Sequence, residues 1–197
     1  VLDDFDPTDI IIFPGRYGNA GILSNLSNYE GKIHIDMNYD CDDILDLDTI
    51  KIQTVFLSTS STSFEEFFKE ISYDNLIKYF DKKNVSQLLI KENRGGSWLY
   101  DFKEKTSYEA PAHIGEIIHS GGVGDVYDIA FMSEMVGTNI AGNMAFAAWM
   151  SSLYAQTIQQ EKFKENVELI VQNIEDFVEM EGIRVPWNER VNYPIYM

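Results

Sequence analysis

Three glycines and an aspartate lie close together in the stretch Ile118–Asp128, which joins a short apolar segment to a long helix-forming run. A glycine turn at such a junction leaves backbone N–H groups bare at the N-terminus of the helix, and bare N–H groups attract anions. Asp125 directly follows the glycines, so its carboxylate is expected beside that anion. A carboxylate in this position could accept a proton during phosphoryl transfer.

Asp125 also has an interpretation that needs no ligand. Aspartate is among the residues that most favour the N-cap of a helix, where its side chain accepts a hydrogen bond from the first turn. A Gly-Gly-x-Gly-Asp sequence is compatible with capping as well as with chemistry. A dinucleotide-binding fingerprint is not indicated, because Gly122 and Gly124 have no third glycine at the required offset.

Strand-like and helix-like segments alternate in the first half of the chain. Short apolar runs predict strands at residues 9–13, 32–36, 54–57 and 87–91, and helical periodicity predicts helices at residues 19–29, 42–50 and 64–81. Alternation at this spacing is typical of right-handed βαβ units on a mostly parallel sheet. The sequence therefore predicts an α/β fold, a three-layer Rossmann-like sheet flanked by helices.

The alternation of strands and helices stops in the second half of the chain. A β-hairpin is expected from residues 98–102 and 106–110, followed by the glycine turn and by helices at residues 124–136, 139–156 and 162–180. The last helix carries an apolar stripe at i, i+3, i+4 spacing, which predicts packing. The stripe consists of Phe163, Val167, Ile170, Val171, Ile174, Phe177 and Val178. The tail from Gly182 has two prolines and no clear period.

With a hairpin before it and a helix after it, the stretch His119–Tyr127 resembles the late signature of the ribokinase-like (PfkB) carbohydrate kinases, Asp-Thr-Thr-Gly-Ala-Gly-Asp-(Ala/Ser)-(Phe/Tyr). The match is carried by Gly122, Gly124, Asp125 and Tyr127. The resemblance implies that Asp125 is the base that deprotonates a sugar hydroxyl. It also implies that the amides of Gly122, Val123 and Gly124 form the anion hole for the transferred phosphoryl group.

Weaker matches follow the order of the family. Asp36–Asn38 resembles its Asp-Pro-Asn, Leu89–Leu99 resembles its strand–turn–strand with Gly-x-x-Gly, and Ile140–Ser151 resembles the helix that borders the nucleotide. The likeness covers nearly all of this chain but only the later part of a full kinase. The family's N-terminal part, with its Gly-Gly sugar-binding motif and lid strands, has no counterpart in the sequence.

Three substitutions depart from the family pattern. His119 replaces the first acid of the signature, Asn93 replaces the first glycine of Gly-x-x-Gly, and Ala148 replaces the asparagine of the nucleotide-bordering helix. Because the sugar-binding motif and the lid strands of the family have no counterpart, features on the nucleotide side are still better preserved than features on the substrate side. The resemblance implies ATP and Mg²⁺ as cofactors, with a nucleotide and a sugar or nucleoside as binding partners.

The magnesium-organising motif of the family, Asn-x-x-Glu, has its nearest counterpart in Ser63–Glu66, with serine in place of asparagine. Glu66 is therefore the candidate residue for the metal, because magnesium bound to a nucleotide needs few carboxylates. The same four residues also form a capping box, Ser-x-x-Glu ahead of an apolar helix. The capping box accounts for them without a metal.

Other reactive side chains give no further site. His34 and His113 have no cysteine or acidic partner at metal-ligand spacing, so zinc is not predicted. Acidic neighbours make Cys41 a weak nucleophile, and His119 is interpreted as a hydrogen-bonded structural residue. Methionine and aromatic side chains at helical spacing are expected in the core, although some could floor an adenine pocket. They are Met132, Met135, Met144, Phe146, Trp149 and Met150.

Composition limits the classes of partner. The net charge of −17 and the scattered distribution of the 15 basic residues argue against nucleic acid. The 197 residues and a hydrophobic share of 45% predict a single domain over residues 1–197. No apolar run approaches the ~18 residues that span a bilayer, no leader is evident, and the single cysteine fits a reducing compartment. A cytoplasmic protein is expected.

The sequence thus predicts transfer of the ATP γ-phosphoryl group to a sugar or nucleoside hydroxyl, with Asp125 as base. The rival is a nucleotide-binding or subunit-interaction module that keeps a kinase-derived fold without catalysis. The start at Val1, which enters a strand pattern within ten residues, also fits the later half of a longer protein. The helical stripes would serve a homo-oligomer as readily as a core.

Overall fold

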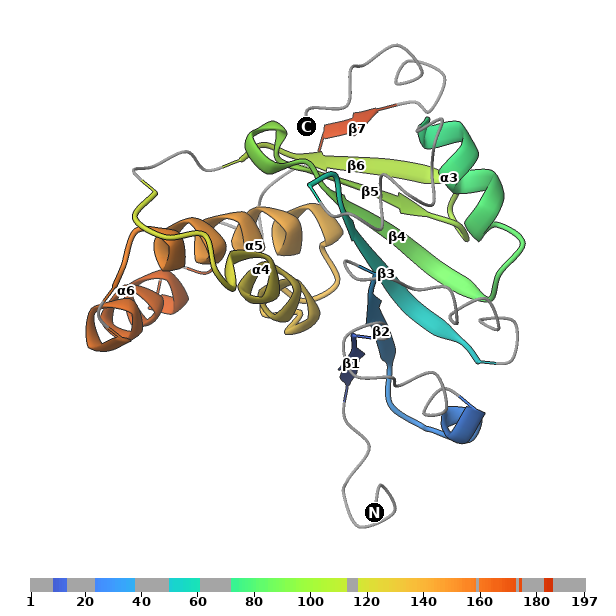
Figure 1. Ribbon diagram of the computed structural model, residues 1–197, viewed down its shortest axis with the longest axis horizontal. Coiled ribbons are helices and arrows are strands. Elements are labelled where there is room, and N and C mark those ends of the chain that lie inside the picture. Colours follow the sequence, from blue (N-terminus) through green and yellow to red (C-terminus); the bar gives the residue numbers. More distant parts are fainter. Residues whose placement is uncertain are drawn as a thin grey trace. The chain divides into compact units, whose positions relative to one another are not determined.

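The computed structural model describes residues 9–13, 24–37, 50–60, 72–112, 117–158, 160–172, 174 and 183–185 (Figure 1). Two compact units are distinguished by their internal contacts. The first contains the described residues up to Glu92 together with Leu99–Ser107, and the second contains Asn93–Trp98 and Tyr108–Val185.

Seven strands form a sheet whose order follows the chain, from β1 to β7. The strands are β1 (Ile10–Ile12), β2 (Ile33–Asp36), β3 (Ile52–Ser58), β4 (Val85–Lys91), β5 (Ser97–Asp101), β6 (Thr106–Ala110) and β7 (Ile183–Val185). The helices are α3 (Tyr73–Phe80), α4 (Val123–Met132), α5 (Ile140–Ala155) and α6 (Gln160–Gln172), with short 3-10 turns at Ser24–Leu26 and Asn93–Gly95. The predicted α/β class and the predominance of parallel pairing are confirmed.

In the first unit, β1 to β4 are paired in parallel. Ile10 lies opposite Ile33, His34 opposite Thr54, and Val55 opposite Leu88. Every residue of β2 and most residues of β3 are buried. Nearly continuous burial of this kind is typical of parallel strands that are covered on both faces, and it explains the unbroken apolar runs of the sequence.

Helix α3 precedes β4 and packs on it. Its N-cap is Ser72, whose hydroxyl accepts a hydrogen bond from the Asn75 amide at 3.2 Å. Leu76 and Phe80 are both fully buried, because residues four apart lie on the same face of a helix. Only this end of the predicted helix 64–81 belongs to the described residues.

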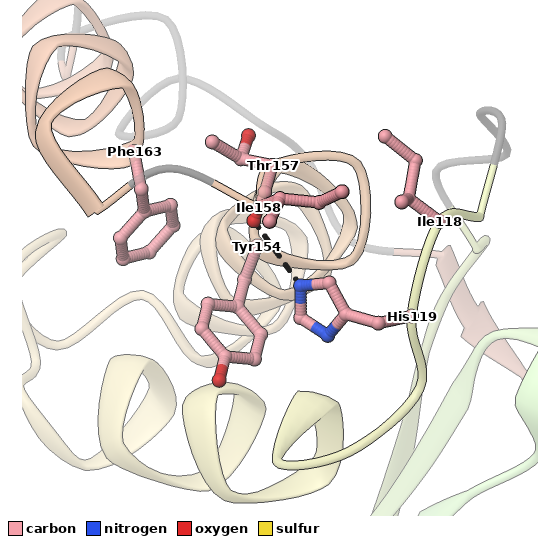
Figure 2. Close-up of a pocket in the computed structure, with 6 residues that line it drawn as sticks. All are labelled: Ile118, His119, Tyr154, Thr157, Ile158 and Phe163. Atoms are coloured by element: carbon pink, nitrogen blue, oxygen red, sulfur yellow. Dashed lines mark hydrogen bonds between the residues drawn. The ribbon is translucent and has the colours of Figure 1, made fainter.

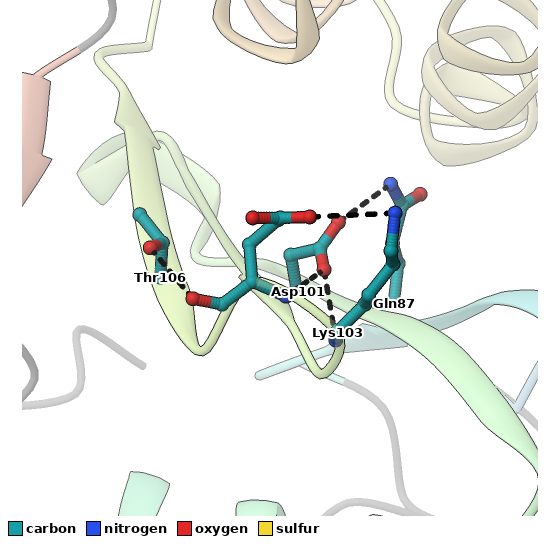
Figure 3. A network of polar contacts seen from close by, with 5 residues as sticks. Gln87, Asp101, Lys103 and Thr106 are labelled. Atoms are coloured by element: carbon teal, nitrogen blue, oxygen red, sulfur yellow. Dashed lines mark hydrogen bonds and ion pairs between the residues drawn. The ribbon is translucent and has the colours of Figure 1, made fainter.

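The hairpin of β5 and β6 is closed by Asp101, as Figure 3 shows. One carboxylate oxygen accepts hydrogen bonds from the amides of Lys103 and Glu104 at 3.0 and 2.9 Å. The other oxygen accepts a hydrogen bond from the side-chain nitrogen of Gln87 on β4 at 3.4 Å. The side-chain oxygen of Gln87 in turn accepts one from the Thr54 hydroxyl on β3 at 3.2 Å. A side chain that bonds the backbone two and three residues on is a common way to close a turn. The hairpin predicted from the sequence is confirmed.

In the second unit, α4 and α5 pack side by side, and α6 continues beyond α5 (Figure 1). Helix α5 is largely apolar with no strongly polar face, and most of its residues are buried, as is typical of a helix inside a core. Its N-cap is Asn139, whose side chain accepts from the Gly142 amide at 3.1 Å.

Helix α4 ends at Met132, four residues before the predicted end at residue 136. The reason is the side chain of Asn143, which is buried at the start of α5. Its carbonyl oxygen accepts from the Val136 amide at 3.1 Å, and its nitrogen donates to the Gly137 carbonyl at 2.8 Å. Positive φ angles at Glu134 and Gly137 complete the departure from helical geometry. The Asn143 side chain thus hydrogen-bonds the amide of Val136 and the carbonyl of Gly137, which a longer α4 would have paired within the helix.

Three further expectations differ from the structure. Helix 19–29 is described only from residue 24, and there it is a three-residue 3-10 turn rather than an α-helix. The tail predicted to lack regular structure contains β7. In α6 the apolar stripe is only partly covered, since Phe163 and Val167 are half-buried and Val171 is 38% exposed. The predicted helix at residues 42–50 and the stripe residues Phe177 and Val178 lie outside the described residues.

Candidate functional site

The glycine turn opens α4 as the sequence predicted. Gly122 is the N-cap residue, with φ +78° and no side-chain capping bond, a backbone conformation that glycine adopts without strain. Its carbonyl accepts from the Val126 amide at 3.0 Å, which starts the helix. The Val123 amide is 3.5 Å from the Ser120 carbonyl, whereas Gly124 lies in the first turn, where N–H groups have no partner within the helix. Of the amides in the predicted anion hole, that of Gly124 therefore has no partner inside the helix, whereas that of Val123 contacts Ser120.

Asp125 is the third residue of α4 and not its N-cap. The capping role that the sequence left open is therefore not the role of this side chain. Asp125 is half-buried, and within the described part of the chain no ion pair or side-chain hydrogen bond involves it. An acid in the first turn still stabilises a helix through the dipole, by about 0.3–1 kcal/mol. The carboxylate is accessible and beside the predicted anion site.

The segment before the turn is attached to the C-terminus of α5. The Ala155 carbonyl accepts from the amides of Ile118 and His119 at 2.9 and 3.2 Å. The His119 ring adds a third contact, from Nε2 to the Thr157 carbonyl at 3.1 Å. The last carbonyl groups of a helix have no partner within the helix. Here the segment that enters the glycine turn supplies the N–H donors for them. The prediction that His119 is a hydrogen-bonded structural residue agrees with this contact.

A pocket of about 660 Å³ lies beside this segment (Figure 2). It is lined by Ile118, His119, Tyr154, Thr157, Ile158 and Phe163. The Tyr154 ring meets the rings of His119 and Phe163 edge to face, with centroids 4.8 and 5.4 Å apart. The Tyr154 hydroxyl is also 3.2 Å from the point that a Cβ at Gly122 would occupy. Pocket and glycine turn are therefore adjacent.

The sequence did not single out most of these pocket residues. Ile118, Tyr154 and Ile158 lie at the ends of predicted elements, and Phe163 was assigned to a packing stripe. Of the methionines and aromatics expected in the core, Met144, Phe146 and Met150 are buried, whereas Met135 and Trp149 are 45% and 37% exposed; none of these five lines the pocket. The only sequence signal was an aromatic residue, Tyr154, near the end of a helix that resembles the nucleotide-bordering one.

Tyr127 fixes the first turns of α4 against the start of β5. Its hydroxyl is 2.6 Å from the Ser97 hydroxyl, and both side chains are buried. Burial raises the pKa of Tyr127 far above its ordinary value, although the hydrogen bond with Ser97 opposes this effect. The phenol therefore stays neutral and can donate a proton in this bond. The aromatic residue of the signature thus anchors the first turns of the helix that carries Asp125 to the start of β5.

The turn before β5 explains one departure from the family pattern. Asn93 has φ +53° and Gly96 has φ +96°, so both ends of the Gly-x-x-Gly pattern have positive φ. Asparagine is one of the few other residues that adopt this conformation readily. Asn93 can therefore replace the first glycine without loss of the turn.

A buried ion pair lies at the carboxyl ends of the parallel strands in the first unit. Lys91, the last residue of β4, is 3.4 Å from the Asp36 carboxylate at the end of β2, and its ammonium lies 5.7 Å from the centroid of the Phe56 ring. The Thr59 amide donates to the Lys91 carbonyl at 3.0 Å. Asp36, the first residue of the Asp-Pro-Asn-like motif, is thus engaged in holding β2 and β4 across β3.

His34 is buried in β2 beside the Phe56 ring, and neither ring nitrogen has a hydrogen-bond partner. Burial lowers the pKa of His34 to about 4, an effect that Asp9 opposes and Lys32 reinforces. The histidine is therefore neutral at pH 7. It is a core residue.

We expect the stability of the protein to fall as the pH decreases from about 6.5 towards 4. In that range the unfolded chain protonates His34 at its ordinary pKa of 6.5, whereas the folded chain does not until about pH 4. The difference corresponds to about 3 kcal/mol. In urea unfolding at several pH values, His34→Leu should gain stability relative to the parent over this interval. A constant difference between the two proteins would contradict the assignment.

Several predicted residues lie outside the described part of the chain: Cys41, Ser63, Glu66 and His113. Among the described residues, no group of three or more His, Cys, Asp or Glu side chains could hold a metal ion. No helix in the described ranges is both long and apolar enough to cross a membrane.

Comparison with known proteins identifies solved structures that have a similar fold. No family model matches the sequence, and no curated protein is similar to it. Solved structures do match. Ribokinase from Thermotoga maritima is 14% identical with a TM-score of 0.63, over 84% of this chain and 57% of its own. Fructokinase with bound ATP from Xylella fastidiosa is 12% identical with a TM-score of 0.65, over 84% and 62%.

A third structure is aminoimidazole riboside kinase from Salmonella enterica, in complex with aminoimidazole riboside and an ATP analogue. It is 12% identical with a TM-score of 0.63, over 90% of this chain and 66% of its own. These likenesses show that the chain has the fold of the ribokinase-like kinases, as the glycine turn and its surroundings implied. The chain spans only about 57–66% of the length of these three kinases.

Proposed function

We propose that this chain binds ATP at the glycine turn and takes part in transfer of the γ-phosphoryl group to a hydroxyl of a sugar or nucleoside. The observation that carries the proposal is the start of α4. Helix α4 begins at a glycine N-cap with φ +78° and no side-chain capping bond, and a half-buried acid follows at Asp125. This arrangement lies on a fold shared with kinases that act on sugars and nucleosides.

In the proposed reaction, the amides of Gly122, Val123 and Gly124 bind the oxygens of the transferred phosphoryl group. Negative charge on these oxygens is stabilised by the fixed N–H dipoles and by the N-terminus of α4. Asp125 accepts the proton of the acceptor hydroxyl while the hydroxyl oxygen forms its bond to phosphorus. The bond between the γ-phosphorus and the bridging oxygen breaks, and ADP leaves.

Magnesium enters the proposal as the complex that it forms with the nucleotide. The described residues offer no acidic cluster for a separate metal site, and nucleotide-bound magnesium keeps several waters and needs few protein ligands. Glu66 stays the proposed contact on the protein side. The acceptor should be selected largely by a part of the fold that the matched kinases have beyond the span of this chain.

Titration calorimetry with ATP and with a non-hydrolysable analogue, both as magnesium complexes, tests the nucleotide site. We expect heat of binding with both. ADP release in the presence of a panel of sugars and nucleosides then tests catalysis. Absence of heat with either nucleotide would reject every nucleotide-binding interpretation, including the non-catalytic one.

The second candidate is a non-catalytic module that binds a nucleotide or a partner subunit. Ala148 favours it, because the family has asparagine there and the side chain of Ala148 is a buried methyl group that cannot hydrogen-bond a nucleotide. The nucleotide-binding form of this candidate predicts heat of binding with ATP but no ADP release with any acceptor, and the subunit-binding form predicts neither. We propose for either case a single cytoplasmic domain over residues 1–197 that has no nucleic-acid or membrane partner and whose helical faces would serve a homo-oligomer as readily as a core.

A further inference from the structure

A buried contact between two hydroxyl groups lies where α4 meets the start of β5. The Ser97 and Tyr127 hydroxyl oxygens are 2.6 Å apart, and the two side chains are only 2% and 6% exposed. The Tyr127 hydroxyl is also 3.5 Å from the Met144 carbonyl oxygen on α5. The kinase signature has either phenylalanine or tyrosine at this position, so the polar contact is an addition to the packing of the ring.

The Ser97 side of the contact is fixed by its backbone. Ser97 is the first residue of β5 and follows Gly96, which has φ +96°. Gly96 lies so close to the Ala110 carbonyl oxygen that a Cβ would be 2.2 Å from it, and its amide donates to the Asn93 carbonyl at 3.2 Å. Side chains on regular elements position their partners more precisely than side chains on loops. Ser97 therefore gives α4 a fixed point of attachment.

The start of α4, in contrast, has no capping side chain. Its N-cap is Gly122, and the Val123 amide is 3.5 Å from the Ser120 carbonyl, which is long for a hydrogen bond. Apolar burial holds a helix against its neighbours, but it is not directional, so it tolerates small rotations about the helix axis. A hydrogen bond is directional and weakens steeply when its geometry changes. The hydroxyl contact therefore restricts a rotation that packing alone permits.

Such a rotation would redirect Asp125. Successive residues lie about 100° apart around a helix, so Asp125 and Tyr127, two residues apart, project towards nearly opposite sides of α4. Their burial agrees, since Tyr127 is buried and Asp125 is half-buried. A fixed Tyr127 hydroxyl therefore also fixes the direction in which the Asp125 side chain leaves the helix.

We propose that the Ser97–Tyr127 hydroxyl pair positions the glycine turn and Asp125, and that it contributes to turnover rather than to the net stability of the fold. The inference rests on the proposed function, in which the start of α4 binds the phosphoryl group and Asp125 accepts the proton. Both hydroxyls act through the helix and not on the reactants. An effect on rate is expected because a misplacement of about 1 Å can cost 10²-fold.

The double variant Ser97→Ala/Tyr127→Phe separates positioning from stability. Each single substitution leaves one buried hydroxyl without its close partner and should lower the urea midpoint, whereas the double variant removes both hydroxyls and should regain most of the parent's stability. Turnover should not recover with it. In the double variant, kcat for ADP release should stay about tenfold below the parent, with the affinity for ATP within about threefold. Parent stability together with parent kcat would overturn the inference.

Hydrogen exchange tests the same positioning without a nucleotide. The Val126 amide donates to the Gly122 carbonyl at 3.0 Å in the first turn of α4, and the Ser133 amide donates to the Ile129 carbonyl at 3.0 Å at the other end. In the double variant the Val126 amide should exchange about tenfold faster than in the parent, whereas the Ser133 amide should keep its rate. Equal exchange of the Val126 amide in both proteins would overturn the inference.

Ser133→Ala is the matched control. The Ser133 hydroxyl donates to the Ala130 carbonyl at 2.6 Å, a contact of the same length at the opposite end of α4. Its loss should change neither kcat nor the exchange of the Val126 amide. If it changes both as the double variant does, any lost hydroxyl on α4 has this effect, and the inference is overturned.

The two measurements also distinguish this inference from the proposed function. If the parent releases no ADP with any acceptor, catalysis is rejected, and faster exchange of the Val126 amide still supports the hydroxyl pair as the contact that positions the glycine turn. If the parent is active and the double variant is stable, slower turnover together with faster exchange supports both.

Discussion

Asp125→Asn is expected to lower the rate of ADP release about a thousandfold while leaving the affinity for ATP unchanged or slightly higher. Asparagine has nearly the same shape as aspartate but cannot accept a proton from the acceptor hydroxyl, and a positioned general base typically contributes 10²–10⁴-fold. The affinity should not fall, because a negative charge next to the phosphates is removed. Steady-state kinetics and titration calorimetry measure the two quantities.

The control for this variant is Glu161→Gln. Glu161 is also an acid in the first turn of a helix, α6, and it is exposed. Both variants lose a favourable interaction with a helix dipole, so both should lose a similar, small amount of stability. Only Asp125→Asn should lose turnover. If Asp125→Asn retains the parent rate, Asp125 is not the base, whatever its effect on folding.

Gly96→Ala is expected to destabilise the fold by about 3–5 kcal/mol. A Cβ at this position would lie 2.2 Å from the Ala110 carbonyl oxygen, 2.8 Å from the Ala112 nitrogen and 2.9 Å from the Pro111 carbonyl carbon. All three are backbone atoms that cannot move aside as a flexible side chain would. The residue also has φ +96°, which costs further free energy in any residue with a Cβ. Thermal unfolding should show a midpoint lowered by roughly 10 °C.

Gly121→Ala provides the matched comparison. A Cβ at Gly121 would meet no atom within 4 Å, so the substitution removes a glycine without a clash. Its stability should lie within about 0.5 kcal/mol of the parent. Equal losses in the two variants would mean that glycine content, rather than the close approach at Gly96, limits stability.

Elements with a strong local pattern were predicted well. The parallel strands are short apolar runs, and the hairpin has a polar turn between two strand-like segments, so their positions follow from residue type. The end of α4 could not be predicted in this way, because it depends on the Asn143 side chain, seven residues beyond Val136. Strand β7 was missed for a related reason. Three residues before a proline carry no periodicity, and only pairing in the sheet reveals them.

In the candidate site, too, the features with a local sequence pattern were predicted and those that depend on distant segments were not. The glycine turn was visible in the sequence because a positive φ at Gly122 demands a particular residue type. Asn93 was interpreted as a departure from the family, but its φ of +53° explains why asparagine is tolerated there. The pocket was not foreseen, because its walls come from the segment before the turn, the end of α5 and the start of α6. No local pattern connects these segments.

The bonds between Ala155, Thr157 and the segment before the glycine turn have a consequence for how the protein can be shortened. A chain cut after α4 would keep every residue of the kinase-like signature, yet Ile118 and His119 would lose the carbonyl groups that hold their amides and ring. The signature would then be present as sequence, but the segment that leads into the glycine turn would lose these contacts. A fragment that keeps them therefore extends at least to Thr157, more than thirty residues past the last glycine of the motif.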